Sequence, residues 1–474
     1  MATSLIEDER VRWRRDGEKS SGGHVVYWMQ QAQRTQHNPA LELAVRQANE
    51  LALPLVVVFC LIGDYPEASA RHYRFMLQGL VDVEQHLARR GIRFDVIVGE
   101  AATTLGRLDA RTALLVTDRG YLPIQRAWRD DVEAATGGPL VEVETDVVVP
   151  IDLVTDKMET AARTIRPKIT RHVDRFVVEL TTTALDNHSV GSEAVDSDWS
   201  RALSDSDLDC VDLDDLDAVI DRLGVAAEPG PVSSWRGGEN EAHRLLGAFI
   251  DGVLGDYESL RNRYDVDHSS SRLSPYLHYG QISPVDVVRR IRAAAAPSDH
   301  VAAFVEELVV RRELAINLVV HHSDFDRFAG LPAWAKETLR ARSEDEREVV
   351  LTAAELEAGE TPDEIWNAIM AQIRDEGWTH NQLRMYWGKQ ILRWTNTPEH
   401  AFRTLLDLNN RHFLDGRDPN SYANVAWCFG RHDQGFQERD VIGKIRPFTD
   451  KALKRKGDLE GWLESRRESN RETT

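Results

Sequence analysis

The sequence predicts an N-terminal α/β domain with a parallel sheet, followed by an all-α C-terminal domain. Up to residue 149, short apolar segments alternate with stretches of helical composition, and after Trp235 apolar residues recur almost everywhere at three- and four-residue spacing. Alternating strands and helices favour a parallel sheet, because each crossover helix returns the chain to the same end of the sheet. With 474 residues and 42% hydrophobic content, the chain can bury the cores of two or three domains.

The expected α/β domain covers residues 22–149. A polar stretch of helical composition over 30–50 separates its first two strands, and HYRFMLQGLVDVEQHLARRG is a later helix. The predicted strands are HVVYW, LPLVVVFCLI, RFDVIVGE, TALLVTD and PLVEVETDVVV. Ligands of such sheets bind at the carboxyl ends of the strands. No GxGxxG motif follows a strand, so a Rossmann dinucleotide site is not supported.

Residues 150–234 are expected to connect this domain to the helical one, which we place at 235–462. Within the connector, residues 191–216 carry nine carboxylates against Arg201 alone, which predicts a solvated loop. The segments with helical spacing are GGENEAHRLLGAFIDGVLGDYESLRN, SPVDVVRRIRAAAA, VAAFVEELVVRRELAINLVV, DEIWNAIMAQIRDEG and NQLRMYWGKQILRW.

Composition restricts the class of protein. A net charge of −20 argues against nucleic acid as a partner of the whole surface, yet residues 439–456 hold seven basic residues and can form a local basic face. The three cysteines, Cys60, Cys210 and Cys428, have no metal-like spacing, so neither a zinc site nor a disulfide framework is expected. With no membrane-length apolar run and no start resembling a secretory signal, the expected location is the cytoplasm.

A hydroxyl-rich segment, DHSSSRLSPYLHYGQIS at 267–283, precedes a helix start and a glycine turn. Hydroxyl donors and free amides at such a place suit a phosphate. An ordinary serine-rich loop with a helix cap is the alternative.

Charged residues interrupt the apolar segment EELVVRRELAIN at 306–317. Charges on an apolar helix are usually paired, and Glu307 with Arg311 at i, i+4 would form such a local pair.

Tryptophans recur in two neighbouring helical segments. Trp366 and Trp378 lie in the first, while Trp387 and Trp394 are seven residues apart and are expected on one face of a single helix. They are either core aromatics or, because an indole can be oxidised transiently, members of an electron relay. Further on, residues 408–446 are dense in Asn, Asp and Gly, which predicts ordered loops with many polar contacts.

Taken together, these segments resemble the photolyase and cryptochrome family. SRLSPYLHYGQIS is similar to its flavin-binding segment, and WNA with LRMYWGKQILRW resembles class II photolyases. LDGRDPN, WCFGRHD and ERDVIGKIR are similar to class II signatures. The resemblance runs from YWMQQAQR to GKIRPFTDKALKRK and leaves out only the acidic insert and the two tails.

The resemblance implies that the helical domain binds FAD and damaged DNA. Asn409 would face the flavin N5, Arg384 would pair with Asp415, and Trp366, Trp387 and Trp394 would photoreduce FAD. Glu307 would bind the dimer and Trp427 would pack against it. The implied FAD-binding residues are Tyr257, Ser270, Ser271, Leu273, Ser274, Arg312, Arg384, Asn409 and Asp415.

Phosphate contacts are expected from the basic stretch, with a solvated tail as the alternative. The candidates are Lys444, Arg446, Lys451, Lys454, Arg455 and Lys456. Two positions depart from the family pattern. Arg311 stands where many photolyases have Trp, and Gln434 stands where several relatives have an Arg that fills the gap in the DNA.

The function implied is light-driven repair of cyclobutane pyrimidine dimers in single- or double-stranded DNA by a monomer. Electron transfer from reduced FAD to a flipped-out dimer would open the cyclobutane. A second, antenna chromophore in the N-terminal domain, a deazaflavin or a folate, stays open. A cryptochrome-like blue-light photoreceptor without repair activity is the alternative, although such receptors usually carry a long C-terminal extension and only about a dozen residues follow Gly461. Repair of the 6-4 photoproduct is less favoured, because histidines beside the lesion would be expected.

Overall fold

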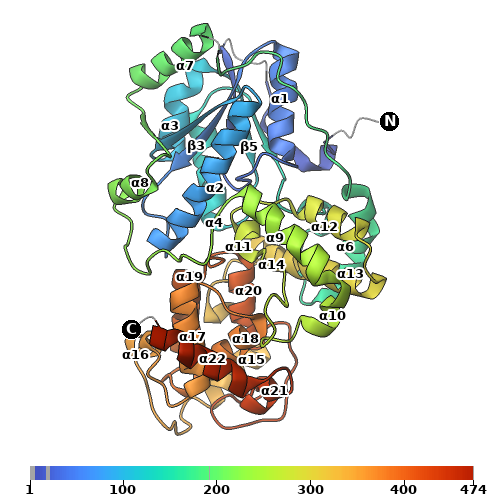
Figure 1. The fold of residues 1–474 in the computed structure, drawn as a ribbon, viewed down its shortest axis with the longest axis vertical. Coiled ribbons are helices and arrows are strands. Elements are labelled where there is room, and N and C mark those ends of the chain that lie inside the picture. Colours follow the sequence, from blue (N-terminus) through green and yellow to red (C-terminus); the bar gives the residue numbers. More distant parts are fainter. Residues whose placement is uncertain (1–5, 18–21, 192, 473–474) are drawn as a thin grey trace.

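The computed structural model describes residues 6–17, 22–191 and 193–472. Two regions lie along the long axis of the molecule (Figure 1): a sheet with helices on both faces, formed mainly by the N-terminal part of the chain, and a region of helices formed by the C-terminal half. This is the predicted combination of an α/β domain with a helical one. Among the described residues, no helix is long and apolar enough to span a bilayer.

In the described part of the chain, the sheet has seven strands in the order β1-β6-β5-β2-β3-β4-β7. The five central strands are parallel, as predicted, while the edge strands β1 and β7 pair antiparallel with β6 and β4. The strands are β1 (Val11–Arg15), β2 (His24–Trp28), β3 (Leu55–Leu61), β4 (Arg93–Val98), β5 (Thr112–Asp118), β6 (Leu140–Val143) and β7 (Asp209–Val211). The central strands read as continuous apolar runs because helices cover both of their faces.

Helices from the N-terminal part of the chain pack on the sheet: α1 (Pro39–Leu51), α2 (Ala70–Arg89), α3 (Ala101–Leu108) and α4 (Pro123–Ala135). The start of α1 shows how the sequence fixes an element locally. The Asn38 side chain accepts hydrogen bonds from the amides of Ala40 and Leu41, and Pro39 occupies the first helical position. The helix is thereby set against β2.

The connector contributes to both regions rather than forming a separate unit. Its helices are α5 (Ile151–Val154), α6 (Ala162–Phe176), α7 (Glu193–Asp205) and α8 (Leu216–Leu223). The prediction of a solvated loop over 191–216 is wrong for the described residues, residue 192 lying outside them. Trp199, Ala202 and Leu203 on α7 are buried against the sheet, and the Trp199 indole donates to Asp95 at 2.9 Å. These three residues dock the helix although the segment is rich in carboxylates.

The C-terminal half is helical, as predicted. Its helices are α9 (Glu239–Gly252), α10 (Tyr257–Leu260), α11 (Ser274–His278), α12 (Pro284–Ala293), α13 (Ser298–Val305), the π-helical segment η4 (Glu306–Arg311), α14 (Arg312–His321), α15 (Ala333–Ala341), α16 (Ala353–Ala358), α17 (Glu364–Glu376), α18 (Asn381–Gln390), α19 (Pro398–His412), α20 (Pro419–Cys428), α21 (Asp450–Lys454) and α22 (Leu459–Glu472). Short 3-10 turns are η1 (Asp8–Arg10), η2 (Asp109–Arg111), η3 (Leu254–Asp256), η5 (Phe328–Gly330) and η6 (Ile391–Arg393).

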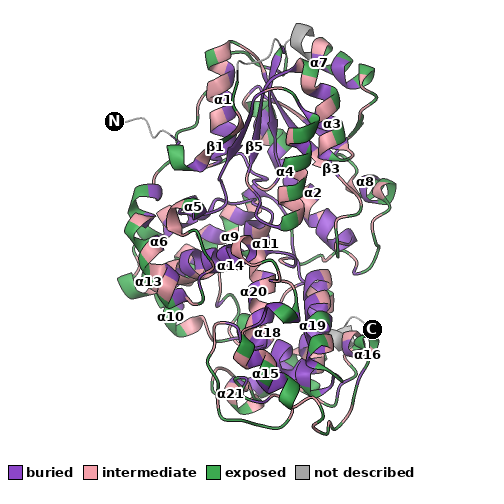
Figure 2. Ribbon diagram, turned by 180° about the vertical axis from the view of Figure 1, so that it is seen from behind, coloured by how far each residue is buried: buried purple, intermediate pink, exposed green. Residues whose placement is uncertain are grey.

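A buried arginine joins the two regions. Arg71 on α2 donates to the carbonyl oxygens of Ile373 at 3.1 Å and His412 at 2.6 Å, in the last turns of α17 and α19. A cation at these ends complements the helix dipoles. Figure 2 shows buried residues in the strands and along the helices at the junction, so the core continues from one region to the other.

Candidate active site

A cavity of about 610 Å³ lies in the helical region, and we call it the main cavity. Its walls come from α10, the loop before α11, η4 with α14, α18, α20 and the segments that follow α19 and α20. It gathers residues predicted from widely separated motifs: Tyr257, Ser270, Ser271, Leu273, Ser274, Glu307, Arg312, Arg384, Asp415, Trp427, Arg446 and Lys456. The size lies in the range of roughly 300 to 1,000 Å³ that is usual for ligand pockets.

The serine loop is held in place by a residue that sequence reasoning missed. The Arg272 guanidinium contacts two indoles, 4.5 Å from the centre of the Trp235 ring and 4.7 Å from that of the Trp378 ring. Arg272 also has a φ of 54°, in the left-handed region that costs energy for a side-chain-bearing residue. The contact of the cation with these aromatic rings stabilises this turn, so that Ser270, Ser271 and Ser274 line the cavity.

Arg384 on α18 organises the opposite wall. Its Nη1 lies 3.0 Å from Asp415 Oδ1, and its Nη2 donates to Asn409 Oδ1 at 2.6 Å. The guanidinium rests on the Phe413 ring at 3.8 Å. The predicted pair of Arg384 with Asp415 is therefore present, and Asn409 is buried beside it.

Glu307 does not pair with Arg311, so the predicted local pair is wrong. Glu307 Oε1 lies 2.6 Å from Arg261 Nη2, whereas Arg311 Nε lies 3.3 Å from Glu306 Oε1. The reason is the π-helical turn η4, in which hydrogen bonds run from i to i+5 and the ordinary i, i+4 neighbours are displaced. Glu307 is 39% exposed and lines the main cavity with Arg261.

Trp427 on α20 lines the same cavity close to η4. The Arg311 guanidinium carbon lies 5.8 Å from the centre of the Trp427 ring, and His432 meets the indole edge-on at 6.1 Å. The cavity thus has a hydrogen-bonding carboxylate, an indole and a guanidinium on neighbouring walls.

Three tryptophans form a buried series next to this site. Trp366 lies between the other two, with ring centres 5.9 Å from Trp387 and 5.7 Å from Trp394. Trp387 contacts Phe413 at 6.0 Å, and Phe413 supports Arg384 at the cavity wall. The expectation that Trp387 and Trp394 share one helix is wrong, because α18 ends at Gln390 and a 3-10 turn precedes Trp394. Trp378 is apart from the series and packs near Trp235.

The basic stretch lies at the rim and beyond it. Arg446 and Lys456 line the main cavity, and Arg446 lies 3.6 Å from Asp433. Lys444, Lys451, Lys454 and Arg455 are exposed outside the lining. Gln434 is exposed on the loop after α20.

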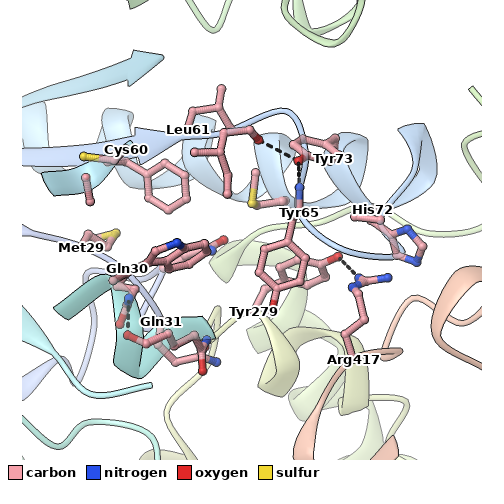
Figure 3. A pocket seen from close by; sticks show the side chains of 18 of the residues that line it. Met29, Gln30, Gln31, Cys60, Leu61, Tyr65, His72, Tyr73, Tyr279 and Arg417 are labelled. Carbon is pink, nitrogen blue, oxygen red and sulfur yellow. Dashed lines mark hydrogen bonds between the residues drawn. The ribbon is translucent and has the colours of Figure 1, made fainter. Parts of the chain in front are cut away.

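A second, smaller cavity of about 120 Å³ lies where the sheet meets the helical region. Figure 3 shows Met29, Gln30 and Gln31, which follow β2, opposite Leu61 at the end of β3 and Tyr65 in the segment after it. The strand order reverses beside β2. The cavity therefore lies in the crevice at the carboxyl ends of the strands, where ligands of parallel sheets usually bind. Gln30 lies in YWMQQAQR, Tyr279 in SRLSPYLHYGQIS and Arg417 in LDGRDPN, but none of these motifs predicted a cavity here.

One side of the small cavity comes from the helical region. Arg417, at a φ of 65°, donates to the Tyr279 hydroxyl at 3.1 Å (Figure 3) and to the Asn410 carbonyl at 2.8 Å. Asn410 in turn accepts from Asn409 at 3.2 Å. A chain of hydrogen bonds therefore connects the small cavity with the wall of the main one.

Comparison with known proteins identifies the family of this chain. Residues 25–185 match the family described as DNA photolyase. The chain is 40% identical over 462 residues to the deoxyribodipyrimidine photo-lyase of Methanothermobacter thermautotrophicus, covering 97% of this chain and 98% of that protein. It is 33% identical to that of Arabidopsis thaliana, covering 98% and 93%. The archaeal photolyase of Sulfolobus tokodaii, solved with two FAD molecules, shares the fold with a TM-score of 0.67 at 17% identity, covering 91% and 87%.

Identity of 33–40% over nearly the full length is decisive, and the chain belongs to the DNA photolyase family. Within this family of flavoproteins it groups with the class II deoxyribodipyrimidine photo-lyases, which confirms the resemblance seen in the motifs. Membership implies FAD as the cofactor and damaged DNA as the substrate.

Proposed function

We propose that this chain uses light to split cyclobutane pyrimidine dimers, with FAD held in the main cavity and a flipped-out dimer bound beside it. The observation that carries the proposal is the shared cavity, which has Arg384 with Asp415 on one side and Glu307 and Trp427 on others. When bound, reduced FAD supplies an electron to the dimer on absorbing blue light and recovers it after the cyclobutane bonds open.

The lining residues fit FAD in their chemistry. The hydroxyls of Ser270, Ser271 and Ser274 are donors suited to pyrophosphate oxygens, and Tyr257 and Leu273 add apolar surface on the same side. Across the cavity, the Arg384–Asp415 pair supplies a fixed donor and acceptor for a polar ring edge, with Asn409 behind it and Arg312 on α14. Arg312 is anchored by Asp146 at 2.7 Å, so its place does not depend on the ligand.

Glu307 and Trp427 would hold the dimer. A carboxylate accepts hydrogen bonds from pyrimidine N–H groups, and its bond to Arg261 orients it before the substrate arrives. The Trp427 indole offers an apolar face to the pyrimidine rings. A dimer is weakly stacked in its duplex, so less free energy is needed to extrude it than a normal base. The exposed cations Lys444, Lys451, Lys454 and Arg455, with Arg446 and Lys456 at the rim, would bind flanking phosphates.

The tryptophan series would supply electrons to the site. Trp394, Trp366 and Trp387 are in ring contact in that order, and Trp387 is nearest to the Arg384 wall through Phe413. Each indole can pass an electron to its neighbour, so the series offers a path along which an electron would reach oxidised FAD.

The small cavity is our proposed antenna site. Aromatic side chains of Phe59, Tyr65, Trp128 and Tyr279 line it, and such walls favour a flat conjugated ring, whether of a deazaflavin or a folate. The solved Sulfolobus protein carries a second FAD described as a light-harvesting cofactor. Protein purified from its own source should therefore show a second absorbing species, and its loss on Tyr279→Ala would locate that species here.

The central test compares Glu307→Ala with wild type, both loaded with FAD. We expect dimer affinity to fall by about tenfold or more and the repair quantum yield to fall, since a charge-assisted hydrogen bond contributes about 1.5 to 3 kcal/mol. FAD content should stay normal. The control Glu376→Ala breaks a similar ion pair, with Arg466 at 2.6 Å, outside the cavity. Full repair per molecule in a destabilised Glu307→Ala protein would refute the role, and absence of dimer binding in wild type would favour a photoreceptor.

A further inference from the structure

Arg311 is a cation at the main cavity whose donors are not in use. Its side chain is 36% exposed and lines the cavity beside Glu307. Among the described residues, the carboxylate within 4.0 Å of its side-chain nitrogens is that of Glu306, at 3.3 Å from Nε, and this contact lacks hydrogen-bond geometry. Within the part of the chain that the structure describes, the Arg311 side chain donates no hydrogen bond.

Glu306 is already engaged elsewhere, which explains why it does not hold Arg311. Arg166 on α6 donates to both Glu306 oxygens, from Nε at 2.9 Å and from Nη2 at 2.7 Å. This is the two-point geometry that a guanidinium and a carboxylate prefer. The donors on Arg311 Nη1 and Nη2 are therefore free to meet a ligand.

The position of the guanidinium is nevertheless restricted. Its carbon lies 5.8 Å from the centre of the Trp427 ring, and its backbone is fixed in the π-helical turn η4. A cation resting against an indole loses less side-chain freedom on binding than one in open solvent. The planar fork of an arginine matches phosphate oxygens better than an ammonium does.

We propose that Arg311 binds the phosphate that joins the two linked pyrimidines of the dimer, and this rests on the function proposed above. A dimer presents polar base edges, ring faces and one internal phosphate. Glu307 suits the edges and would repel the phosphate, Trp427 suits the rings, and Arg311 is the complementary group for the phosphate beside them. Arg311 thus helps to select a joined dinucleotide over a single flipped base.

The test uses oligonucleotides in which one phosphate is replaced by an uncharged methylphosphonate. One carries it inside the dimer, a second at the next linkage on the 3′ side, and a third is unmodified. Wild type, Arg311→Gln and the control Arg292→Gln are compared, all with FAD. Arg292 is 35% exposed and paired with Asp174 at 2.7 Å, and it does not line the cavity.

We expect Arg311→Gln to weaken binding of the unmodified dimer by about tenfold. It should reduce the slope of log affinity against log salt by about one. With the methylphosphonate inside the dimer the difference from wild type should vanish, whereas with the flanking one it should persist. Arg292→Gln should match wild type throughout. Arg311→Lys should keep the salt slope and lose part of the affinity.

An equal loss on all three oligonucleotides, a loss that vanishes only with the flanking methylphosphonate, or no loss would each overturn the proposal. FAD content and melting temperature show whether Arg311→Gln is folded, and Arg311→Lys provides the same comparison if it is not. Failure of wild type itself to prefer the dimer over undamaged DNA would refute the proposed function, and the role of Arg311 with it. That result is separate from a failure of Arg311 alone, in which wild type still binds.

Discussion

Trp366 donates a hydrogen bond from its indole Nε1 to the carbonyl oxygen of Trp387 at 2.8 Å, while the two rings stack with centres 5.9 Å apart. The bond ties α17 to α18 and fixes the separation of the two π systems. Trp394 then meets Trp366 edge-on at 5.7 Å. The three indoles are therefore in continuous ring contact, as an electron relay requires.

Trp387→Phe should abolish or strongly slow the photoreduction of oxidised FAD, because a phenyl ring is much harder to oxidise than an indole. Repair by chemically reduced protein should stay close to that of wild type, since the dimer wall is untouched. Absorption changes under blue light, followed by a repair assay, measure both. Trp462→Phe, in the same core but outside the series, should have no effect on photoreduction. Equal loss of both activities in Trp387→Phe would make Trp387 a packing residue.

Arg384→Gln should weaken FAD binding by about ten- to hundredfold, because it removes a charged donor worth about 1.5 to 3 kcal/mol and leaves Asp415 without its partner. Fluorescence titration of the protein with FAD gives the dissociation constant. Arg340→Gln, which breaks an exposed pair with Glu399, is the control. Unchanged FAD affinity in Arg384→Gln would remove this pair from the flavin site.

Arg71→Ala should destabilise the protein by about 3 kcal/mol, because it leaves buried carbonyls of α17 and α19 without their donor. The two regions should then unfold in separate steps, so calorimetry should show a broader or split transition. A single transition at the wild-type temperature would show that the apolar contacts alone join the regions.

The contribution of Glu313 to stability should fall as pH rises above the acidic range. Burial raises the pKa of Glu313 to about 8, against hydrogen bonds from the amides of Val148 and Val149 that favour the charged form. An unfolded glutamate titrates at about 4.3, so between these values the folded protein holds a proton that the unfolded chain has released. This group lowers the free energy of unfolding by up to about 1.4 kcal/mol per pH unit as pH rises.

Glu313→Gln should flatten this dependence in melting curves taken from pH 5 to 8. Part of the slope should remain, because burial also raises the pKa of Glu144 to about 7 and of Asp146 to about 6. Glu460→Gln, at an exposed carboxylate, should keep the wild-type slope. A slope that is the same in Glu313→Gln and wild type would contradict the buried proton.

Sequence patterns predicted an element correctly where the residues of that element alone determine its conformation. HVVYW and TALLVTD coincide with β2 and β5, and the spacing in DEIWNAIMAQIRDEG predicts α17. Sequence patterns failed where contacts between distant parts of the chain determine the local structure. The acidic α7 is a helix because Trp199 docks on the sheet, and the π-helical turn that separates Glu307 from Arg311 leaves no mark in the periodicity.

The candidate site shows the same division. Motifs identified the residues that line the main cavity, because each motif is local and chemically distinctive. The supports of those residues could not be predicted. Arg272 contacts Trp235 and Trp378, and Arg261 pairs with Glu307, but these partners are far apart in the chain and carry no shared pattern.

A repair assay is the most direct test of the proposed function. Protein loaded with reduced FAD is mixed with an oligonucleotide containing one cyclobutane thymine dimer, illuminated with blue light or kept in the dark, and the intact thymines are quantified by chromatography. We predict that dimers are converted to thymines in the light over many turnovers and not in the dark. Dimers that stay intact in the light, although FAD is bound and reduced, would contradict the proposal that this cavity splits them.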